Sequence, residues 1–297
     1  MCGIMGYYSF GKTIPDKDKI TNMFSLLESR GRDASGFAFI RDNNLIVHKD
    51  AMKSSEFVKT NKWKELVLPS SMILHTRMKT QGSEKNNANN HPLFSKNGIA
   101  IVHNGIIYND KEVFGKKQRD AEVDSESILH LLSMKMKGDK IKRLFDKVEG
   151  SFAVAVLDKY QPERLVLIKK DNPIDLYYDV KDDIFYFCSE REIMQEALSI
   201  EKTTVRGFNL GEKDYHFYEM HNNYALFINN EGVESYQKYY PSKSKWFDRR
   251  YHYSNTPEEM IIECPWCFSQ TTYYDGKLFN KCEVCGMGIN EEDLYVI

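Results

Sequence analysis

Two pairs of cysteines near the end of the sequence leave that segment few ways to fold. Cys264 and Cys267 form one C-x2-C pair, Cys282 and Cys285 form a second, and 14 residues separate the pairs. Four thiolates at this spacing are typical ligands of a tetrahedral structural zinc ion. So short a segment can scarcely form a core without a metal. We therefore predict a zinc ribbon over residues 261–297, in which these cysteines bind a structural Zn2+.

A redox-active dithiol is the alternative for the first pair, Cys264-Pro-Trp-Cys267, but a second pair at ribbon spacing favours zinc. Zinc ribbons often contact nucleic acid or protein partners, and the basic residues of this segment are too few to choose between them. Residues 241–260 have no regular apolar period, so we predict a linker there. It holds the local basic cluster of Lys243, Lys245, Arg249 and Arg250.

Cysteine use and charge limit the environment and the partners of the chain. Four of the six cysteines lie in the last 34 of 297 residues, which indicates metal binding in a reducing compartment and no disulfide framework. A net charge of -2 gives no overall basic field to attract nucleic acid or a membrane. The apolar runs are shorter than the ~20 residues of a membrane helix, and the first residues show no secretory signal. We expect a cytoplasmic protein.

Short strand patterns alternate with amphipathic helix patterns from residue 4 to about residue 200. Hairpins are predicted at Asp42–Asn44 and at Asn229–Gly232, because turn residues there separate apolar runs. Apolar spacing predicts one helix that begins before Ile20 and ends near Gly31, and another near residues 56–66. Because hairpins dominate over long crossovers, we predict an α+β fold with antiparallel sheets and helices on their outer faces.

Cys2 follows the initiator methionine directly, at a position where chain ends fray and pack poorly. A free cysteine is usually a small buried hydrophobe, which is one interpretation. The other begins with removal of the methionine, which a small second residue favours. Cys2 would then carry a free α-amine with an ordinary pKa of ~7.7 to 8.0 that can accept the thiol proton. One residue would supply both nucleophile and base, and Gly3 permits a close backbone approach.

Five blocks of sequence then decide between these interpretations. They are MCGIMGYY at residues 1–8, RGRDASGFAF at 30–39, ILHTRMKTQG at 73–82, HNGIIYN at 103–109 and VDSESILHLL at 123–132. In their order and spacing they resemble class II glutamine amidotransferase domains, the N-terminal-nucleophile (Ntn) glutaminases. The resemblance implies an Ntn-hydrolase fold, a four-layer α/β/β/α sandwich of mainly antiparallel sheets, over residues 2–240.

The resemblance also implies roles for single residues. Glutamine amide hydrolysis needs a nucleophile, which would be Cys2, and oxyanion donors, which would be the Asn104 side chain and the Gly105 backbone N–H. Arg77 would pair with the substrate α-carboxylate and Asp124 with the α-ammonium. Two alternatives stay open, because Asn-Gly is also an ordinary turn signal and Asp124 also stands where a helix N-cap belongs.

Further residues stand at pocket positions of the family. Arg30, Thr80 and Gly82 are predicted to line or support the substrate site, and Asp33 is predicted to be structural. The chain departs from the family pattern at Met78 and Gln81, where many members carry an aromatic residue and a histidine. This departure concerns the pocket wall. It leaves in place the nucleophile, the oxyanion donors, and the pair Arg77 and Asp124 that would bind the two charged ends of the substrate.

These features predict a glutaminase that converts L-glutamine to glutamate and ammonia through a γ-glutamyl thioester, without a cofactor for that reaction. We find no acceptor domain or phosphate-binding loop after residue 240, so an acceptor enzyme on another chain is expected. Two alternatives differ in class. One is an Ntn hydrolase of another amide, and the other is a non-catalytic zinc-ribbon adaptor on an amidotransferase scaffold.

Overall fold

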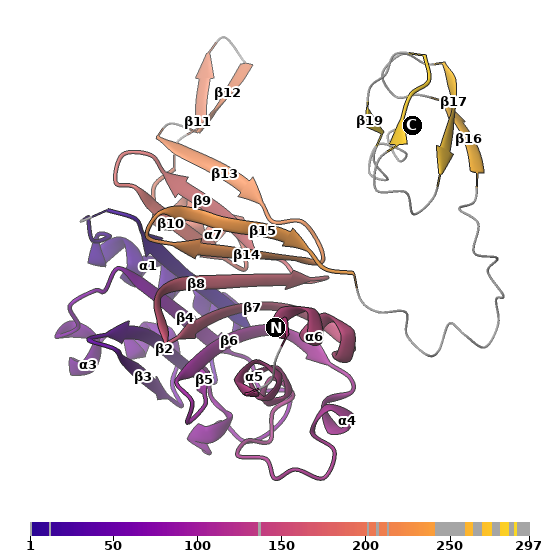
Figure 1. Ribbon diagram of the computed structural model, residues 1–297. Coiled ribbons are helices and arrows are strands. Elements are labelled where there is room, and N and C mark those ends of the chain that lie inside the picture. Colours follow the sequence, from indigo (N-terminus) through magenta and orange to yellow (C-terminus); the bar gives the residue numbers. More distant parts are fainter. Residues whose placement is uncertain are drawn as a thin grey trace. The chain divides into compact units, whose positions relative to one another are not determined.

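The computed structural model describes residues 2–11, 13–135, 138–200, 202–205, 208–212, 214–240, 259–263, 269–274, 280–284 and 288–289 (Figure 1). The chain divides into two compact units, residues 1–242 and residues 243–297. Of the predicted zinc ligands, Cys264, Cys267 and Cys285 lie outside the described residues, as does most of the predicted linker. The domain limits derived from the sequence remain a prediction.

The larger unit is built on two antiparallel sheets. The first has seven strands in the order β13-β9-β10-β1-β4-β2-β3, and the second has six in the order β15-β14-β8-β7-β6-β5. The strands of the first sheet are β1 (Gly3–Ser9), β2 (Ala34–Arg41), β3 (Asn44–Asp50), β4 (Ser71–Arg77), β9 (Asp175–Asp179), β10 (Ile184–Cys188) and β13 (Tyr215–Glu219). Those of the second are β5 (Leu93–Phe94), β6 (Ile99–Ile107), β7 (Gly150–Asp158), β8 (Gln161–Lys170), β14 (Tyr224–Asn229) and β15 (Gly232–Lys238).

The helices of this unit are short. They are α1 (Lys17–Leu26), α2 (Ser54–Phe57), α3 (Asn61–Lys64), α4 (Asp110–Phe114), α5 (Glu126–Ser133), α6 (Lys140–Lys147) and α7 (Arg191–Ala197), with 3-10 turns η1 (Leu27–Arg30) and η2 (Asn87–Asn89). Two strand pairs stand outside the large sheets, β11 (Lys202–Val205) with β12 (Phe208–Glu212), and in the second unit β16 (Glu259–Glu263) with β17 (Gln270–Tyr274). The second unit also pairs β18 (Asn280–Lys281) with β19 (Gly288–Ile289). In the described ranges no helix has the length and apolarity to span a membrane.

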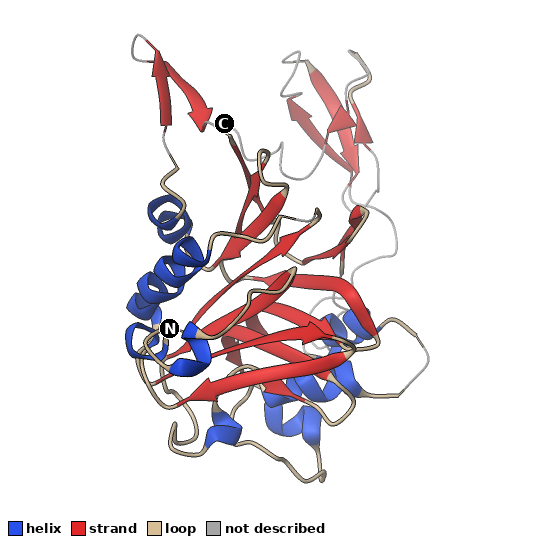
Figure 2. Cartoon of the chain, turned by 90° about the vertical axis from the view of Figure 1, so that its left-hand side faces the viewer, coloured by secondary structure: helices blue, strands red, loops and turns tan. Residues whose placement is uncertain are grey.

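Three apolar clusters hold the layers together. One fills the space between the sheets, where Ile73, Val102 and Leu167 are completely buried. A second packs α1, α2, α3 and α7 on the outer face of the first sheet, and a third packs α5 and α6 on the outer face of the second. Figure 2 shows the helices on both outer sides of the stacked sheets. The predicted antiparallel α+β arrangement with outer helices is therefore confirmed.

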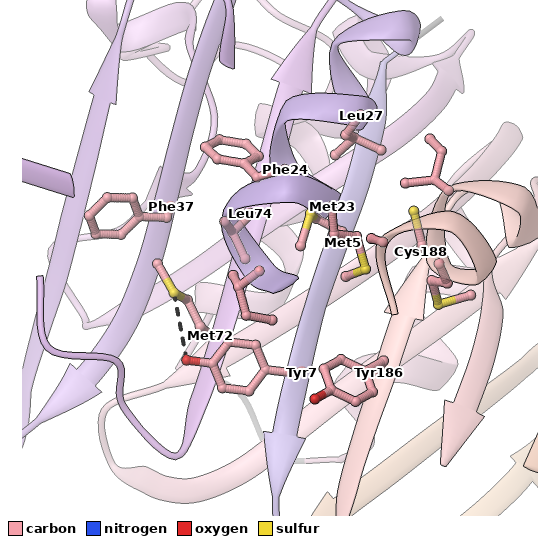
Figure 3. Packing of buried hydrophobic residues seen from close by; sticks show 14 of the residues in the cluster. Met5, Tyr7, Met23, Phe24, Leu27, Phe37, Met72, Leu74, Tyr186 and Cys188 are labelled. Carbon is pink, nitrogen blue, oxygen red and sulfur yellow. Dashed lines mark hydrogen bonds between the residues drawn. The ribbon is translucent and has the colours of Figure 1, made fainter. Parts of the chain in front are cut away.

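The contact between α1 and the first sheet shows how the sequence pattern produces this packing. Met23 and Phe24 of α1 point onto β1, where Met5 and Tyr7 share the outward face at the spacing of alternate strand residues (Figure 3). The Tyr7 hydroxyl, buried in this layer, donates to the Pro69 carbonyl oxygen at 3.0 Å. The helix predicted from the apolar spacing before Gly31 is thus confirmed.

The predicted hairpins are also confirmed. Asp42 and Asn43 have φ of 50° and 58°, which residues of this type tolerate in the tight turn between β2 and β3. The single helix predicted near residues 56–66 is wrong, because α2 and α3 replace it. Thr60 has an extended backbone and is the N-cap of α3, where its hydroxyl accepts the Trp63 N–H. The helix is therefore interrupted at Thr60.

Gly6 offers a test of how tightly β1 is packed. A Cβ at this position would lie 2.2 Å from the Met72 carbonyl oxygen and 2.4 Å from the Phe187 ring. We expect Gly6→Ala to lower the free energy of unfolding by roughly 1–3 kcal/mol through overpacking. Gly11→Ala is the matched control, because the nearest atom to its Cβ would be 3.7 Å away. Equal urea midpoints for the two variants would contradict this account.

Candidate active site

The site begins where β1 starts and β4 ends. The two strands are antiparallel and Gly3 pairs with Thr76, so Cys2 lies across from Arg77, the last residue of β4. The Cys2 thiol donates to the Met78 carbonyl oxygen at 3.6 Å. Gly3 is required by this approach, because a Cβ there would lie 2.7 Å from Leu27. Pairing of β1 with β4 therefore holds Cys2, at the start of the chain, in a defined position.

Arg30 anchors the backbone of the nucleophile. Its Nε donates to the Cys2 carbonyl oxygen at 3.3 Å, and its Nη1 pairs with Glu190 at 2.6 Å. Ile4, two residues after Cys2, is held by Ser189, whose hydroxyl accepts the Ile4 N–H at 2.9 Å. These contacts give Arg30 a supporting position, while its direct contact with substrate stays a prediction.

The charges of Arg77 and Asp124 both act on the Cys2 thiol. Burial raises the pKa of this thiol, and a hydrogen bond with the Met78 backbone lowers it in part. Arg77 lowers the same pKa and Asp124 raises it. Since both side chains are close enough to influence the sulfur, the structure brings together three residues that are far apart in the sequence.

Arg77 is buried and held in one orientation. Its Nη1 donates to the Asn90 Oδ1 at 2.8 Å, and its Nη2 donates to the Gln81 and Gly82 carbonyl oxygens. These bonds use three of the five guanidinium N–H groups, and within the described residues the other two are available to a further acceptor. Burial lowers the pKa of Arg77, and the nearby charges of Cys2 and Asp124 are among those that raise it.

The loop after β4 carries the remaining predicted pocket residues. Asp33 accepts the Lys79 N–H at 2.6 Å, and its own N–H donates to the Arg77 carbonyl oxygen. Asp33 therefore fixes the backbone from Arg77 to Lys79, in line with its predicted structural role. Gly82 has φ of +66° and accepts from Arg77, whereas Thr80 and Met78 are exposed.

Asp124 is buried but does not cap helix α5. Its Oδ2 accepts the Ile107 N–H at 2.7 Å and its Oδ1 accepts the Ser125 N–H at 2.8 Å. The N-cap position belongs to Ser125, which makes no side-chain capping bond. The capping explanation for Asp124 is therefore wrong. Each carboxylate oxygen has lone pairs beyond these bonds, so the side chain can accept from a further cation.

Asn104 and Gly105 lie on β6, in the second sheet. The Asn104 side-chain Nδ2 is buried and has no hydrogen-bond partner within the described residues. A buried donor without a partner costs free energy, and such groups mark sites that a ligand completes. Gly105 has φ of +148°, and a Cβ there would lie 2.0 Å from the Ser151 carbonyl oxygen. An ordinary turn is excluded, because both residues are inside a strand that continues to Ile107.

Sequence reasoning missed three histidines beside these residues. His75, His91 and His103 are buried, and the rings of His75 and His91 stack with centroids 4.2 Å apart. The His75 Nε2 donates to the His103 carbonyl oxygen at 3.0 Å, which joins β4 to β6. The only sequence signal was the position of His75 near Arg77 and of His103 beside Asn104, which did not predict a contact between the two sheets.

The comparisons with known proteins identify the domain that carries this site. Residues 75–196 match the family model described as a glutamine amidotransferase domain. The isomerizing glutamine-fructose-6-phosphate aminotransferase of Aquifex aeolicus is 34% identical over 183 residues, which are 59% of this chain and 30% of that protein. The chain carries a glutamine amidotransferase domain.

Other relatives support this domain and its fold. The aminotransferase of the same name from Bacteroides thetaiotaomicron is 30% identical over 230 residues, covering 72% of this chain and 36% of that one. The chain spans about a third of the length of such relatives. A solved glutamine phosphoribosylpyrophosphate amidotransferase from B. subtilis has a TM-score of 0.62 at 17% identity, covering 81% of this chain and 50% of the other. At that identity the likeness concerns the fold.

The second unit has little apolar core in its described part. Cys282 and Thr271 are buried, whereas Ile261 is 77% exposed and Val284 is 66% exposed. The Cys282 Sγ accepts the Val284 N–H at 3.4 Å, the kind of bond that orients a thiolate ligand. Cys282 therefore fits a metal site. In the described ranges no cluster of three potential ligands is present, since the other three cysteines lie outside them.

The buried His75 of the amidotransferase domain gives a pH prediction. Burial lowers its pKa to about 3, so the folded chain keeps it neutral while the unfolded chain takes up a proton below its ordinary pKa of ~6.5. Its contribution to stability is present above pH ~6.5 and is lost as pH falls, by about 2 kcal/mol at pH 5. Urea unfolding at pH 7 and pH 5 measures the loss.

His75→Gln is the matched variant, because an amide N–H can replace the Nε2–H but does not titrate. We expect the change in stability between pH 7 and pH 5 to be about 2 kcal/mol smaller in the variant. The same change in both proteins would contradict a neutral buried His75.

Proposed function

We propose that this chain hydrolyses the side-chain amide of L-glutamine through Cys2, giving glutamate and ammonia. The observation that carries the proposal is the position of Cys2 across from Arg77, where β1 begins and β4 ends, with Asp124 near enough for its charge to raise the pKa of the thiol. A cation and an anion near one nucleophile suit the α-carboxylate and α-ammonium of an amino acid. This favours glutamine over a simple amide as the substrate, and it argues against an Ntn hydrolase of an unrelated amide.

The proposed reaction uses the chain's own groups. After removal of Met1, the Cys2 α-amine accepts the thiol proton and the sulfur attacks the amide carbon of glutamine. The oxygen of the tetrahedral intermediate takes up negative charge and accepts from the Asn104 Nδ2 and the Gly105 N–H. The proton returns to the leaving nitrogen, the C–N bond breaks and ammonia departs. Water then attacks the γ-glutamyl thioester, which releases glutamate and restores the thiol.

The raised pKa of Cys2 makes the α-amine necessary in this scheme. A thiol with a pKa above its ordinary value is protonated near neutral pH and is a poor nucleophile. A base at the same residue removes the proton only as the sulfur attacks. An acceptor enzyme on a separate chain that receives the ammonia remains a prediction from the sequence.

The test is glutamate release from glutamine by the purified chain, combined with mass spectrometry of its N-terminus. We expect loss of Met1 and loss of activity in Cys2→Ala. Asn104→Ala should lower kcat by ~10²–10³ with a smaller effect on KM, because the oxyanion forms only in the transition state.

Cys188→Ala is the control, because Cys188 lies on β10 and is buried in the apolar cluster between the first sheet and its helices, outside the proposed site. It should retain glutaminase activity. An intact Met1 in active protein, or equal activity in Cys2→Ala, would overturn the mechanism. A chain that loses Met1 but hydrolyses no glutamine would support the non-catalytic alternative.

We further propose that Cys264, Cys267, Cys282 and Cys285 bind one structural Zn2+. The spacing of the two cysteine pairs and the buried, hydrogen-bonded Cys282 thiol support this proposal. When bound, the ion supplies cross-links that substitute for an apolar core. It takes no part in the glutaminase reaction.

Metal analysis of the purified chain tests the zinc proposal. We expect about one zinc per chain, and a marked loss of zinc in Cys282→Ser because a hydroxyl is a poor ligand for this ion. Cys188→Ala, outside the ribbon, should keep its zinc. A metal-free wild-type chain that is folded over residues 259–289, or equal zinc in Cys282→Ser, would contradict it.

A further inference from the structure

His103 lies between several groups of the proposed glutaminase site, next to Asn104 in the chain and hydrogen-bonded to the neighbours of Arg77 and Asp124. Its backbone carbonyl accepts from His75 on β4, and its ring Nδ1 lies 2.7 Å from the Ser125 hydroxyl oxygen. The next two residues along β6 are the proposed oxyanion donors, Asn104 and Gly105. One buried residue therefore connects β4, which carries Arg77, with β6, which carries the proposed oxyanion donors, and with the start of α5, which follows Asp124.

The ring of His103 is neutral and fixed. Burial lowers its pKa, while the nearby Asp124 charge raises it in part. In either neutral tautomer the Nδ1 bonds the Ser125 hydroxyl, as acceptor when Nε2 carries the proton and as donor when Nδ1 does. A contact of 2.7 Å between buried groups is a short hydrogen bond that orients both partners.

Ser125 transmits this orientation to the neighbouring carboxylate. Its N–H donates to the Asp124 Oδ1 at 2.8 Å, and its hydroxyl lies 3.4 Å from the same oxygen. Because Ser125 is the N-cap of α5 but caps nothing with its side chain, its hydroxyl is available to His103. The hydrogen bond between His103 and Ser125 thus orients Ser125, which in turn orients the Asp124 carboxylate.

The backbone carbonyl of His103 connects to the strand that carries Arg77, the proposed partner of the substrate α-carboxylate. His75 donates to this carbonyl from a position two residues before Arg77 on β4. A carbonyl oxygen only accepts, so the His75 Nε2 carries the proton. Packing alone does not require these groups, since an apolar side chain would fill the same space without the cost of burying polar atoms.

We propose that His103 is a positioning residue that sets the distance between the groups that bind the two ends of glutamine. It acts on the α-ammonium site through Ser125 and Asp124, and on the α-carboxylate site through His75 and β4. This rests on the proposed glutaminase function. It assigns His103 no proton transfer and no contact with substrate.

The test compares His103→Leu with His103→Asn. The asparagine amide can replace Nδ1 as donor or acceptor to Ser125, whereas leucine has a similar bulk and leaves the hydroxyl unpaired. We expect His103→Leu to raise the KM for glutamine about 10-fold or more with a smaller change in kcat. His103→Asn should recover most of the lost affinity. Ser125→Ala should raise KM in the same way and add little to His103→Leu, because the two act through one bond.

Alkylation of the Cys2 thiol by iodoacetamide separates positioning from general damage. This reagent needs no amino-acid clamp, so its rate should be similar in the wild type and His103→Leu. An unchanged KM in His103→Leu, or a KM that His103→Asn fails to recover, would overturn the proposal. So would equal loss of alkylation and hydrolysis. If the wild type hydrolyses no glutamine, the proposed function fails instead.

Discussion

The buried contact between the two sheets is the constraint on which the site depends. Apolar residues from both sheets exclude water between them, and the hydrogen bond from His75 to the His103 carbonyl oxygen joins β4 to β6 beside the nucleophile. The proposed nucleophile Cys2 and Arg77 lie at the ends of strands of the first sheet, and the proposed oxyanion donors, Asn104 and Gly105, lie on β6 of the second. A change in sheet spacing would separate these two pairs of residues.

The electrostatics of the site suit a substrate that carries both charges. Arg77 favours the Cys2 thiolate and Asp124 disfavours it, so their effects on the sulfur oppose each other. A bound amino acid would place its α-carboxylate at Arg77 and its α-ammonium at Asp124. Because these two charges cancel, it would add no net charge near the sulfur. The thiol would then experience a similar field before and after binding, and the α-amine would still control its proton.

Local patterns predicted much of this fold, and the limits of such patterns explain the errors. Alternating apolar residues and the Asp42-Asn43 turn were sufficient for the β2–β3 hairpin, because a hairpin is determined by nearby residues. The order of the five sequence blocks led to Cys2, Arg77, Asn104 and Asp124. The contacts of Arg30 with Glu190 and of Arg77 with Asn90 could not be predicted, because tertiary packing alone brings these partners together. The sequence offered Asp124 as a possible cap, and only the backbone geometry shows that the N-cap of α5 is the next residue, Ser125.

The unpartnered amide of Asn104 has a consequence for how this protein responds to small molecules. A buried donor without an acceptor costs the folded chain roughly 1–3 kcal/mol. Any compound that supplies an oxygen at that point relieves the cost, whether or not it reacts. Ligands that resemble the proposed tetrahedral intermediate more than the substrate should therefore protect the fold best against heat.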